Sequence, residues 1–100
     1  MENGNQKVQE LLQANIGCSV RAMMGDWVVY YNQKVVGGVY DGRLLVKPTP
    51  AARKLLPFCR EELPYLGAKP MLLVTQTEPT FLSTLFSAIA NELPAPHKKK

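Results

Sequence analysis

The chain has 100 residues, of which 46% are hydrophobic, and a formal net charge of +4. This length and composition predict one domain with a conventional apolar core, and they exclude a largely disordered chain. Three of the 12 basic residues form the tail Lys98–Lys100, which leaves nine basic against eight acidic residues in the body. The body is therefore close to neutral, which argues against nucleic-acid binding by a globally basic fold.

Few side chains suited to metal binding or nucleophilic catalysis are present. The cysteines, Cys18 and Cys59, are far apart, and the single His97 lies near the basic tail. Zinc needs about four converging nitrogen or sulfur ligands, so we expect no metal and no cofactor. The polar N-terminus indicates no signal peptide, and no apolar run reaches the roughly 20 residues of a membrane span. We expect a cytoplasmic protein with reduced thiols.

The first element predicted along the chain is a helix. Residues 1–5 are a polar leader, and Val8, Leu11 and Leu12 then recur at helical spacing. Gly17 is a plausible stop, so we expect a short one-faced helix near residues 6–16.

A three-stranded antiparallel meander follows from about residue 26. Aromatic and β-branched residues at 27–31 predict a strand, and Asn32-Gln33 predicts a tight turn. A second strand spans residues 35–40 and ends at Asp41-Gly42, a strong signal for a two-residue hairpin loop. The third strand covers residues 43–47, and Pro48 ends it because proline cannot donate to the ladder.

The remaining elements are shorter until the last helix. Thr49 is expected to cap a helix that runs through Leu56. A short strand is expected at Tyr65-Leu66 and another at residues 71–75. Thr77 or Glu78 then caps the final helix. Its buried stripe is predicted to comprise Leu82, Leu85, Phe86, Ile89 and Leu93.

Two-residue loops at both turns predict the register and hence the two faces of the meander. In this register Val29 lies opposite Val36 and Trp27 lies opposite Gly38, and side chains alternate between the faces. The face predicted to form the core under the helices carries Val28, Tyr30, Val35, Val39, Leu44 and Val46. The other face is aromatic and apolar in its middle and basic at its edges. This face also carries Val36, and as a candidate interaction face it comprises Trp27, Val29, Tyr31, Lys34, Tyr40, Arg43, Leu45 and Lys47.

Three roles are open for this second face. Another segment of the chain can cover it, or it can be a partly wet sheet surface. It can bind a protein, most simply a second copy in a homodimer. It can also be a platform on which single-stranded bases stack beside basic side chains. The sequence does not choose among these roles.

No catalytic constellation emerges from the sequence. The position of His97 removes Ser-His and Cys-His pairings, and Glu61-Glu62 are best interpreted as a solvated turn. Gly37-Gly38 lies within a strand pattern and lacks the spacing of a phosphate-binding loop. We therefore assign no catalytic residue and expect a protein that is not an enzyme.

The order of short motifs resembles the N-terminal domain of the TfoX/Sxy family. The segments that carry the resemblance are Arg-x-Met-Met-Gly at 21–25, the Asp-Gly turn, Leu-x-Val-Lys at 44–47, Gly-Ala-Lys-Pro-Met at 67–71 and Glu-Leu-Pro at 92–94. The resemblance covers roughly residues 6–95, with residues 96–100 as a basic tail. It implies an α+β fold, α-β-β-β-α-β-β-α, similar to secretion chaperones, with helices on one face.

The resemblance also implies a function. Longer members regulate competence genes together with a transcriptional activator and are not enzymes. The hypothesis is thus a single-domain module that acts through protein contacts, with any nucleic-acid involvement indirect. One alternative is a domain that binds or converts a small molecule in a pocket near Arg21, Met24 and Lys69. A second alternative is weak binding of single-stranded nucleic acid.

Overall fold

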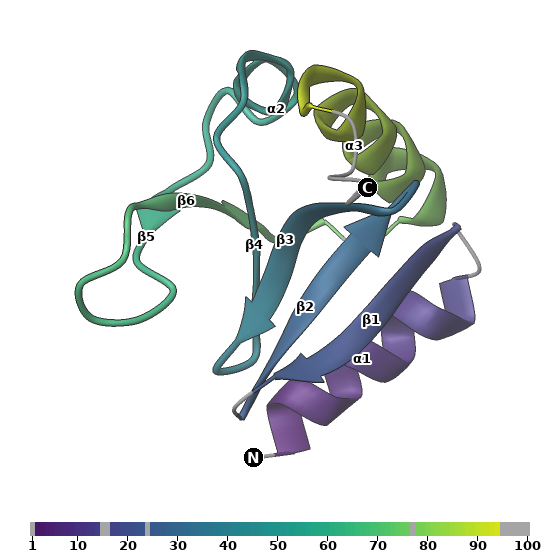
Figure 1. The fold of residues 1–100 in the computed structure, drawn as a ribbon, viewed down its shortest axis with the longest axis vertical. Coiled ribbons are helices and arrows are strands. Elements are labelled where there is room, and N and C mark those ends of the chain that lie inside the picture. Colours follow the sequence, from purple (N-terminus) through teal and green to yellow (C-terminus); the bar gives the residue numbers. More distant parts are fainter. Residues whose placement is uncertain (1, 15–16, 24, 77, 95–100) are drawn as a thin grey trace, which may run out of the picture.

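One antiparallel sheet of six strands organises the fold, in the order β1-β2-β3-β4-β6-β5. The computed structural model describes residues 2–14, 17–23, 25–76 and 78–94. The elements in chain order are α1 (Glu2–Ala14), β1 (Cys18–Met23), β2 (Asp26–Tyr31), β3 (Lys34–Tyr40), β4 (Arg43–Val46), α2 (Pro50–Leu55), β5 (Glu61–Glu62), β6 (Met71–Val74) and α3 (Pro79–Glu92). All three helices contribute to one apolar cluster and therefore cover the same face of the sheet (Figure 1). The predicted α+β class is confirmed.

The two predicted hairpin turns are present. Asn32 and Gln33 have φ of 55° and 67°, and Asp41 and Gly42 have φ of 56° and 79°. Positive φ at both central residues defines the type I′ turn, whose twist matches that of the flanking strands. Both turns can be recognised from sequence because the requirement is local to two residues.

Three boundaries differ from the expectation. The meander has four strands, because β1 pairs along its whole length with β2. The first helix begins at Glu2, so residues 2–5 of the polar leader belong to α1 instead of preceding it. The short strand pairs with β6 at Glu61–Glu62, and the expected strand at Tyr65-Leu66 is absent from that position. Glu61-Glu62 is polar and shows no alternation, so the sequence does not predict a strand there. These residues are a strand only because they pair with β6 in the folded protein.

A β-bulge in β3 changes the expected register. Tyr31 lies opposite Lys34 as predicted, but Val29 lies opposite Gly37 and the intervening Val36 is extra. The bulge places two consecutive residues of β3 against one residue of β2. Gly37 suits this position, because a Cβ there would collide with the backbone of β4, including Val46 Cα at 2.8 Å.

The bulge exchanges part of the predicted faces. Val39, Leu44 and Val46 belong to the core as predicted, and the core also contains Val29 and Val36, which were assigned to the opposite face. Val28, Tyr30 and Val35 were expected in the core under the helices and lie outside this cluster, although Val28 is buried. Side chains alternate between the two faces on each side of the bulge. The extra residue shifts the alternation by one position, so the side chains of β2 and of the start of β3 lie on the face opposite to the predicted one.

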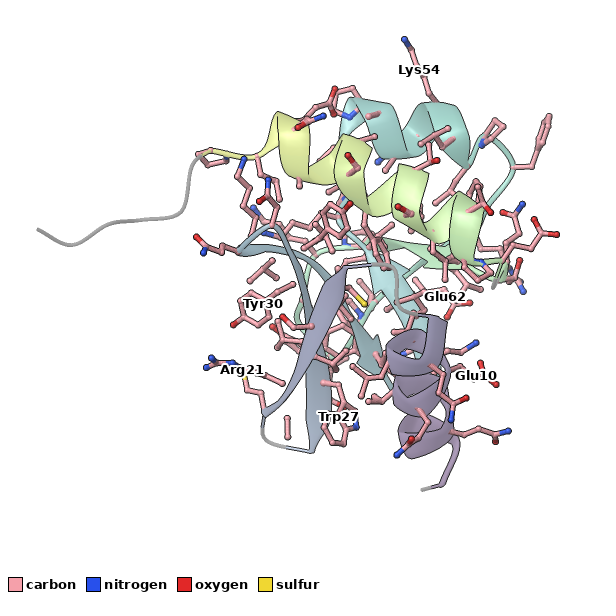
Figure 2. All side chains as sticks on the ribbon, turned by 90° about the vertical axis from the view of Figure 1, so that its right-hand side faces the viewer. Glu10, Arg21, Trp27, Tyr30, Lys54 and Glu62 are labelled. Atoms are coloured by element: carbon pink, nitrogen blue, oxygen red, sulfur yellow. The ribbon has the colours of Figure 1, made fainter. Side chains whose placement is uncertain are left out.

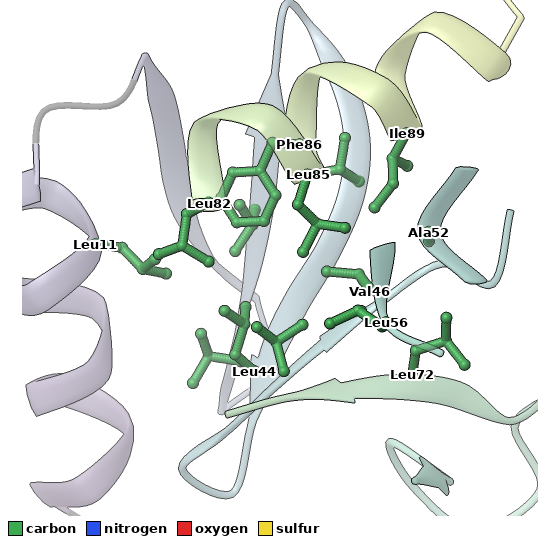
Figure 3. Packing of buried hydrophobic residues seen from close by; sticks show 14 of the residues in the cluster. Leu11, Leu44, Val46, Ala52, Leu56, Leu72, Leu82, Leu85, Phe86 and Ile89 are labelled. Atoms are coloured by element: carbon green, nitrogen blue, oxygen red, sulfur yellow. The ribbon is translucent and has the colours of Figure 1, made fainter. Parts of the chain in front are cut away.

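The core lies between this face and the helices. Leu82 and Phe86 of α3 point toward Leu11 of α1 and Leu44 of β4, and Leu85 and Ile89 continue the stripe (Figure 3). Each fully buried side chain of this kind stabilises the fold by roughly 1.5–3 kcal/mol. Leu93, the last residue of the predicted stripe, is partly buried at the end of α3.

The helix caps agree partly with the sequence. The Thr49 hydroxyl accepts a hydrogen bond from the amide of Ala52 at 3.2 Å, and α2 ends at Leu55, before Pro57. Glu78 occupies the N-cap position of α3 without a side-chain cap bond. The alternative cap, Thr77, lies outside the described residues.

Candidate functional site

The predicted interaction face is divided between the two sides of the sheet. Trp27, Val29 and Tyr31 lie on the helix side, where Val29 is fully buried and the other two pack against the core. The Tyr31 and Phe86 ring centroids are 6.3 Å apart. Figure 2 shows Trp27 toward α1 and Tyr30 on the opposite side. These three aromatic and apolar side chains therefore support the fold.

Lys34 also belongs to the helix side. Its ammonium donates hydrogen bonds to the carbonyl oxygens of Ala90 at 2.8 Å and Leu93 at 3.2 Å. These carbonyls lie at the C-terminal end of α3, where few backbone amides remain to bind them, and that of Ala90 also accepts the Leu93 amide at 3.2 Å. Lys34 thus joins the β2–β3 turn to α3.

The other members of the predicted face, Tyr40, Arg43, Leu45 and Lys47, lie on the side of the sheet away from the helices, called here the outer face. Leu45 is completely buried although it is not part of the helix-side cluster. Tyr40, Arg43 and Lys47 are partly exposed. The segment that joins β5 to β6, residues 63–70, called here the β5–β6 loop, meets this face at Tyr40 and Arg43.

A groove of about 510 Å³ lies between the outer face and this loop. Its lining is mainly apolar and aromatic, with two lysines. The lining residues are Val35, Gly37, Tyr40, Lys47, Pro48, Pro64, Tyr65, Gly67, Ala68, Lys69, Pro70 and Met71. This set is called the loop groove below. It brings together residues that are up to 36 positions apart (35 to 71) and that no sequence motif connects.

Arg43 holds the base of the β5–β6 loop against the sheet. Its guanidinium donates to the Glu62 carboxylate at 2.7 Å and to the carbonyl oxygen of Pro64 at 3.4 Å. A third hydrogen bond joins Nε to the carbonyl oxygen of Tyr40 at 3.1 Å. One planar donor group thus links β3, β5 and the loop, an arrangement that suits the fixed geometry of arginine.

Two tyrosines meet within the groove. The rings of Tyr40 and Tyr65 pack edge to face with centroids 6.2 Å apart. The Tyr40 ring lies over Gly38, where an added Cβ would come within 2.7 Å of the ring. Burial raises the pKa of the Tyr40 hydroxyl above its ordinary value of 10.0, and the charges of Tyr65 and then Asp26 raise it further. The Tyr40 hydroxyl therefore keeps its proton to a higher pH than an exposed tyrosine does.

The β5–β6 loop presents apolar side chains to solvent. Leu66 is 95% exposed, Tyr65 60% and Leu63 44%. Large apolar side chains gathered in one segment usually mark a contact surface. The sequence contains a signal for this, because Leu63-Pro64-Tyr65-Leu66-Gly67 is apolar without the alternation of a strand.

The charge of the loop groove comes from two lysines. Arg43 is neutralised by Glu62, whereas Lys47 and Lys69 form no ion pair with any carboxylate of the described residues. The loop groove is therefore a mainly apolar depression with two unneutralised ammonium groups.

Arg21 and Lys69, two of the three residues of the predicted pocket, do not come together. Lys69 lines the loop groove. Arg21 lies on β1, where its guanidinium carbon is 5.8 Å from the ring centroid of Tyr30, and it does not line the groove. Met24 lies outside the described residues.

A second depression, of about 330 Å³, lies beside the segment after α2 and includes Phe58, which is 95% exposed, and Cys59. The other cysteine, Cys18, has its thiol pKa raised mainly by burial, which disfavours the reactive thiolate. Among the side chains that the structure describes, those of residues 6–14, 17–23, 25–76 and 78–94, no group of three or more His, Cys, Asp or Glu could hold a metal ion. No helix of the described residues is long and apolar enough to cross a membrane.

Comparison with known proteins shows the family to which the chain belongs. It is 37% identical over 84 residues to an "uncharacterized 12.7 kDa protein in trpE 5'region" from Spirochaeta aurantia, and the match covers 81% of this chain and 72% of that protein. The chain belongs to the same family as this spirochaetal protein. No family model matches the chain. No solved structure matches it.

Proposed function

We propose that this protein is a non-enzymatic interaction module that binds a protein partner through the β5–β6 loop and the loop groove. The observation that carries the proposal is the exposure of Leu63, Tyr65 and Leu66 on a loop that Arg43 anchors to the sheet. A preorganised apolar surface loses less conformational entropy on binding than a mobile one. Exposed leucine and tyrosine beside a groove therefore suit a protein contact.

The wider role that we propose is that of a regulator-like module of the TfoX N-terminal type. The support is the motif order described above together with the α+β fold. Its helices stand first, between the two groups of strands and last, as the resemblance implies, with one more strand before the second helix. The corresponding hypothesis is a role in transcription or competence through protein contacts. Cys18 and Cys59 are free thiols, which supports our placement of the module in the cytoplasm.

Site-specific photo-crosslinking in the source cells tests the contact surface. A photoreactive amino acid in place of Leu66 should form defined adducts, whereas one in place of Phe58 should not. Both side chains are 95% exposed, so the pair controls for exposure. An adduct of twice the chain mass would identify a second copy as the partner, which light scattering would check. Adducts from Phe58 alone, or from neither position, would refute this surface.

A second candidate function is binding of a small molecule in the loop groove. The volume of about 510 Å³ lies within the range of roughly 300–1,000 Å³ typical of ligand pockets. Native mass spectrometry of the purified protein should then reveal a bound species that Tyr65→Ala releases. A spectrum with only the apoprotein mass, and no thermal shift with a metabolite library, would exclude this function.

A further inference from the structure

We infer that the loop groove recognises an acidic peptide segment with an apolar anchor residue. This inference rests on the proposed function and specifies its partner class. The lining is apolar and aromatic around Tyr65 and Met71, and Lys47 and Lys69 contribute its unneutralised charge. A matching ligand therefore needs an apolar side chain for the groove and carboxylates for the two ammonium groups.

The neighbouring charges sharpen this requirement. The Arg43 guanidinium is engaged with Glu62 at 2.7 Å and with two carbonyl oxygens, so it serves the loop and not the ligand. Lys47 is partly buried and Lys69 is exposed, so the two ammonium groups differ in their access to solvent. An ammonium group is a compact charge that can bind carboxylates in many orientations. The two lysines of the groove therefore select a negatively charged ligand, and its apolar lining selects an apolar anchor side chain.

A peptide fits these features better than a nucleic acid. Nucleic-acid affinity depends on several cations that track the phosphates and on open aromatic faces that stack on bases. Here the groove supplies two lysines, and one face of the Tyr40 ring is taken by Gly38 while Tyr65 packs against the ring edge to face. An apolar side chain needs only the space beside these rings. Two lysines beside an apolar lining therefore favour an acidic peptide over a nucleic acid.

Selection from random peptides displayed on phage tests the inference without a known partner. Peptides selected on the full chain should be enriched in Asp and Glu next to Leu, Met or aromatic residues. Labelled synthetic copies of these peptides should then bind the protein, as measured by fluorescence anisotropy, and higher salt should weaken this binding. Lys47→Gln and Lys69→Gln should each weaken binding by about twofold to fivefold, as loss of an ion pair near the protein surface does.

The matched control is Lys54→Gln. Lys54 is an exposed lysine that projects from α2 into solvent (Figure 2), and its substitution removes the same charge. Equal weakening by all three substitutions would show a general charge effect and would overturn the inference. Selected peptides without acidic enrichment would overturn it too. Labelled oligothymidylate that binds in a Lys47- and Lys69-dependent way, where the acidic peptides do not, would assign the groove to nucleic acid instead.

The outcomes also separate this inference from the proposed function. If neutral peptides bind and Leu66→Asp abolishes their binding, the interaction module stands and the acidic specificity is wrong. If Leu66→Asp, Lys47→Gln and Lys69→Gln all leave every selected peptide bound, both proposals fail. Circular dichroism of each variant would show whether its fold is intact.

Discussion

The ammonium group of Lys34 donates a 2.8 Å hydrogen bond to the carbonyl oxygen of Ala90. The two residues are 56 positions apart, and the bond joins the β2–β3 turn to the C-terminal end of α3. A cation at this end is favourable because the helix macrodipole places partial negative charge there. The contact therefore serves both the hairpin and the helix.

Substitution of Lys34 by Met should lower the free energy of unfolding by about 1–2 kcal/mol, since two charge-assisted hydrogen bonds are lost. The melting temperature should fall by roughly 5–10 °C for a domain of this size. Urea unfolding followed by circular dichroism measures the change. Lys54→Met is the control, because the exposed Lys54 side chain on α2 has no hydrogen bond or ion pair within the described residues. Equal effects of the two variants would contradict the role assigned to Lys34.

The pair Arg43–Glu62 should contribute more than the pair Arg53–Glu61. The side chains of the first pair are 31% and 27% exposed, and those of the second are 52% and 47% exposed. A double-mutant cycle with Gln at each position should give a coupling of about 1 kcal/mol for the first pair and less than about 0.5 kcal/mol for the second. Hydrogen exchange of residues 63–70 should accelerate in Arg43→Gln only. Unchanged exchange there would show that Arg43 does not anchor the loop.

Replacement of Gly37 by Ala should cost about 3 kcal/mol, because the new methyl group meets the backbone of Leu45 and Val46, which cannot rotate away. Gly67→Ala is the informative comparison. Gly67 has φ of 89° with open space where the alanine methyl group would lie, so its cost is backbone strain of about 1 kcal/mol. Denaturant unfolding measures both. A smaller loss for Gly37→Ala than for Gly67→Ala would contradict the close approach of β3 and β4.

Stability should depend on Tyr40 at high pH. Its pKa is higher in the folded protein than the ordinary 10.0 because of burial and then the charges of Tyr65 and Asp26. The folded state thus keeps a proton that the unfolded chain loses. The stabilisation is fully present below pH 10 and is lost as the pH rises through the folded pKa. Tyr40→Phe should unfold with a shallower loss of stability between about pH 9 and pH 12, measured by urea titration at each pH. Identical pH profiles would refute the shift.

Local signals predicted much of this fold correctly. The type I′ turns depend on residues that accept positive φ, the start of α2 depends on Thr49 three residues before the amide that it caps, and the stripe of α3 depends on helical spacing. Each feature lies within a few consecutive residues. The Gly37-Gly38 pair also carried a signal of a bulge or a close backbone approach, which the uniform two-residue alternation passed over.

The candidate site needed the tertiary structure. The expected face containing Trp27 and Tyr31 assumed an unbroken register, and one extra residue at Val36 moved both side chains to the helix side. The loop groove forms only where the β5–β6 loop returns over β3 and β4, and Arg43–Glu62 is the contact that keeps it there. Turns and caps depend on the conformations of adjacent residues, which the local sequence indicates. Strand partners, bulges and grooves depend on packing between distant segments, so only the folded chain decides them.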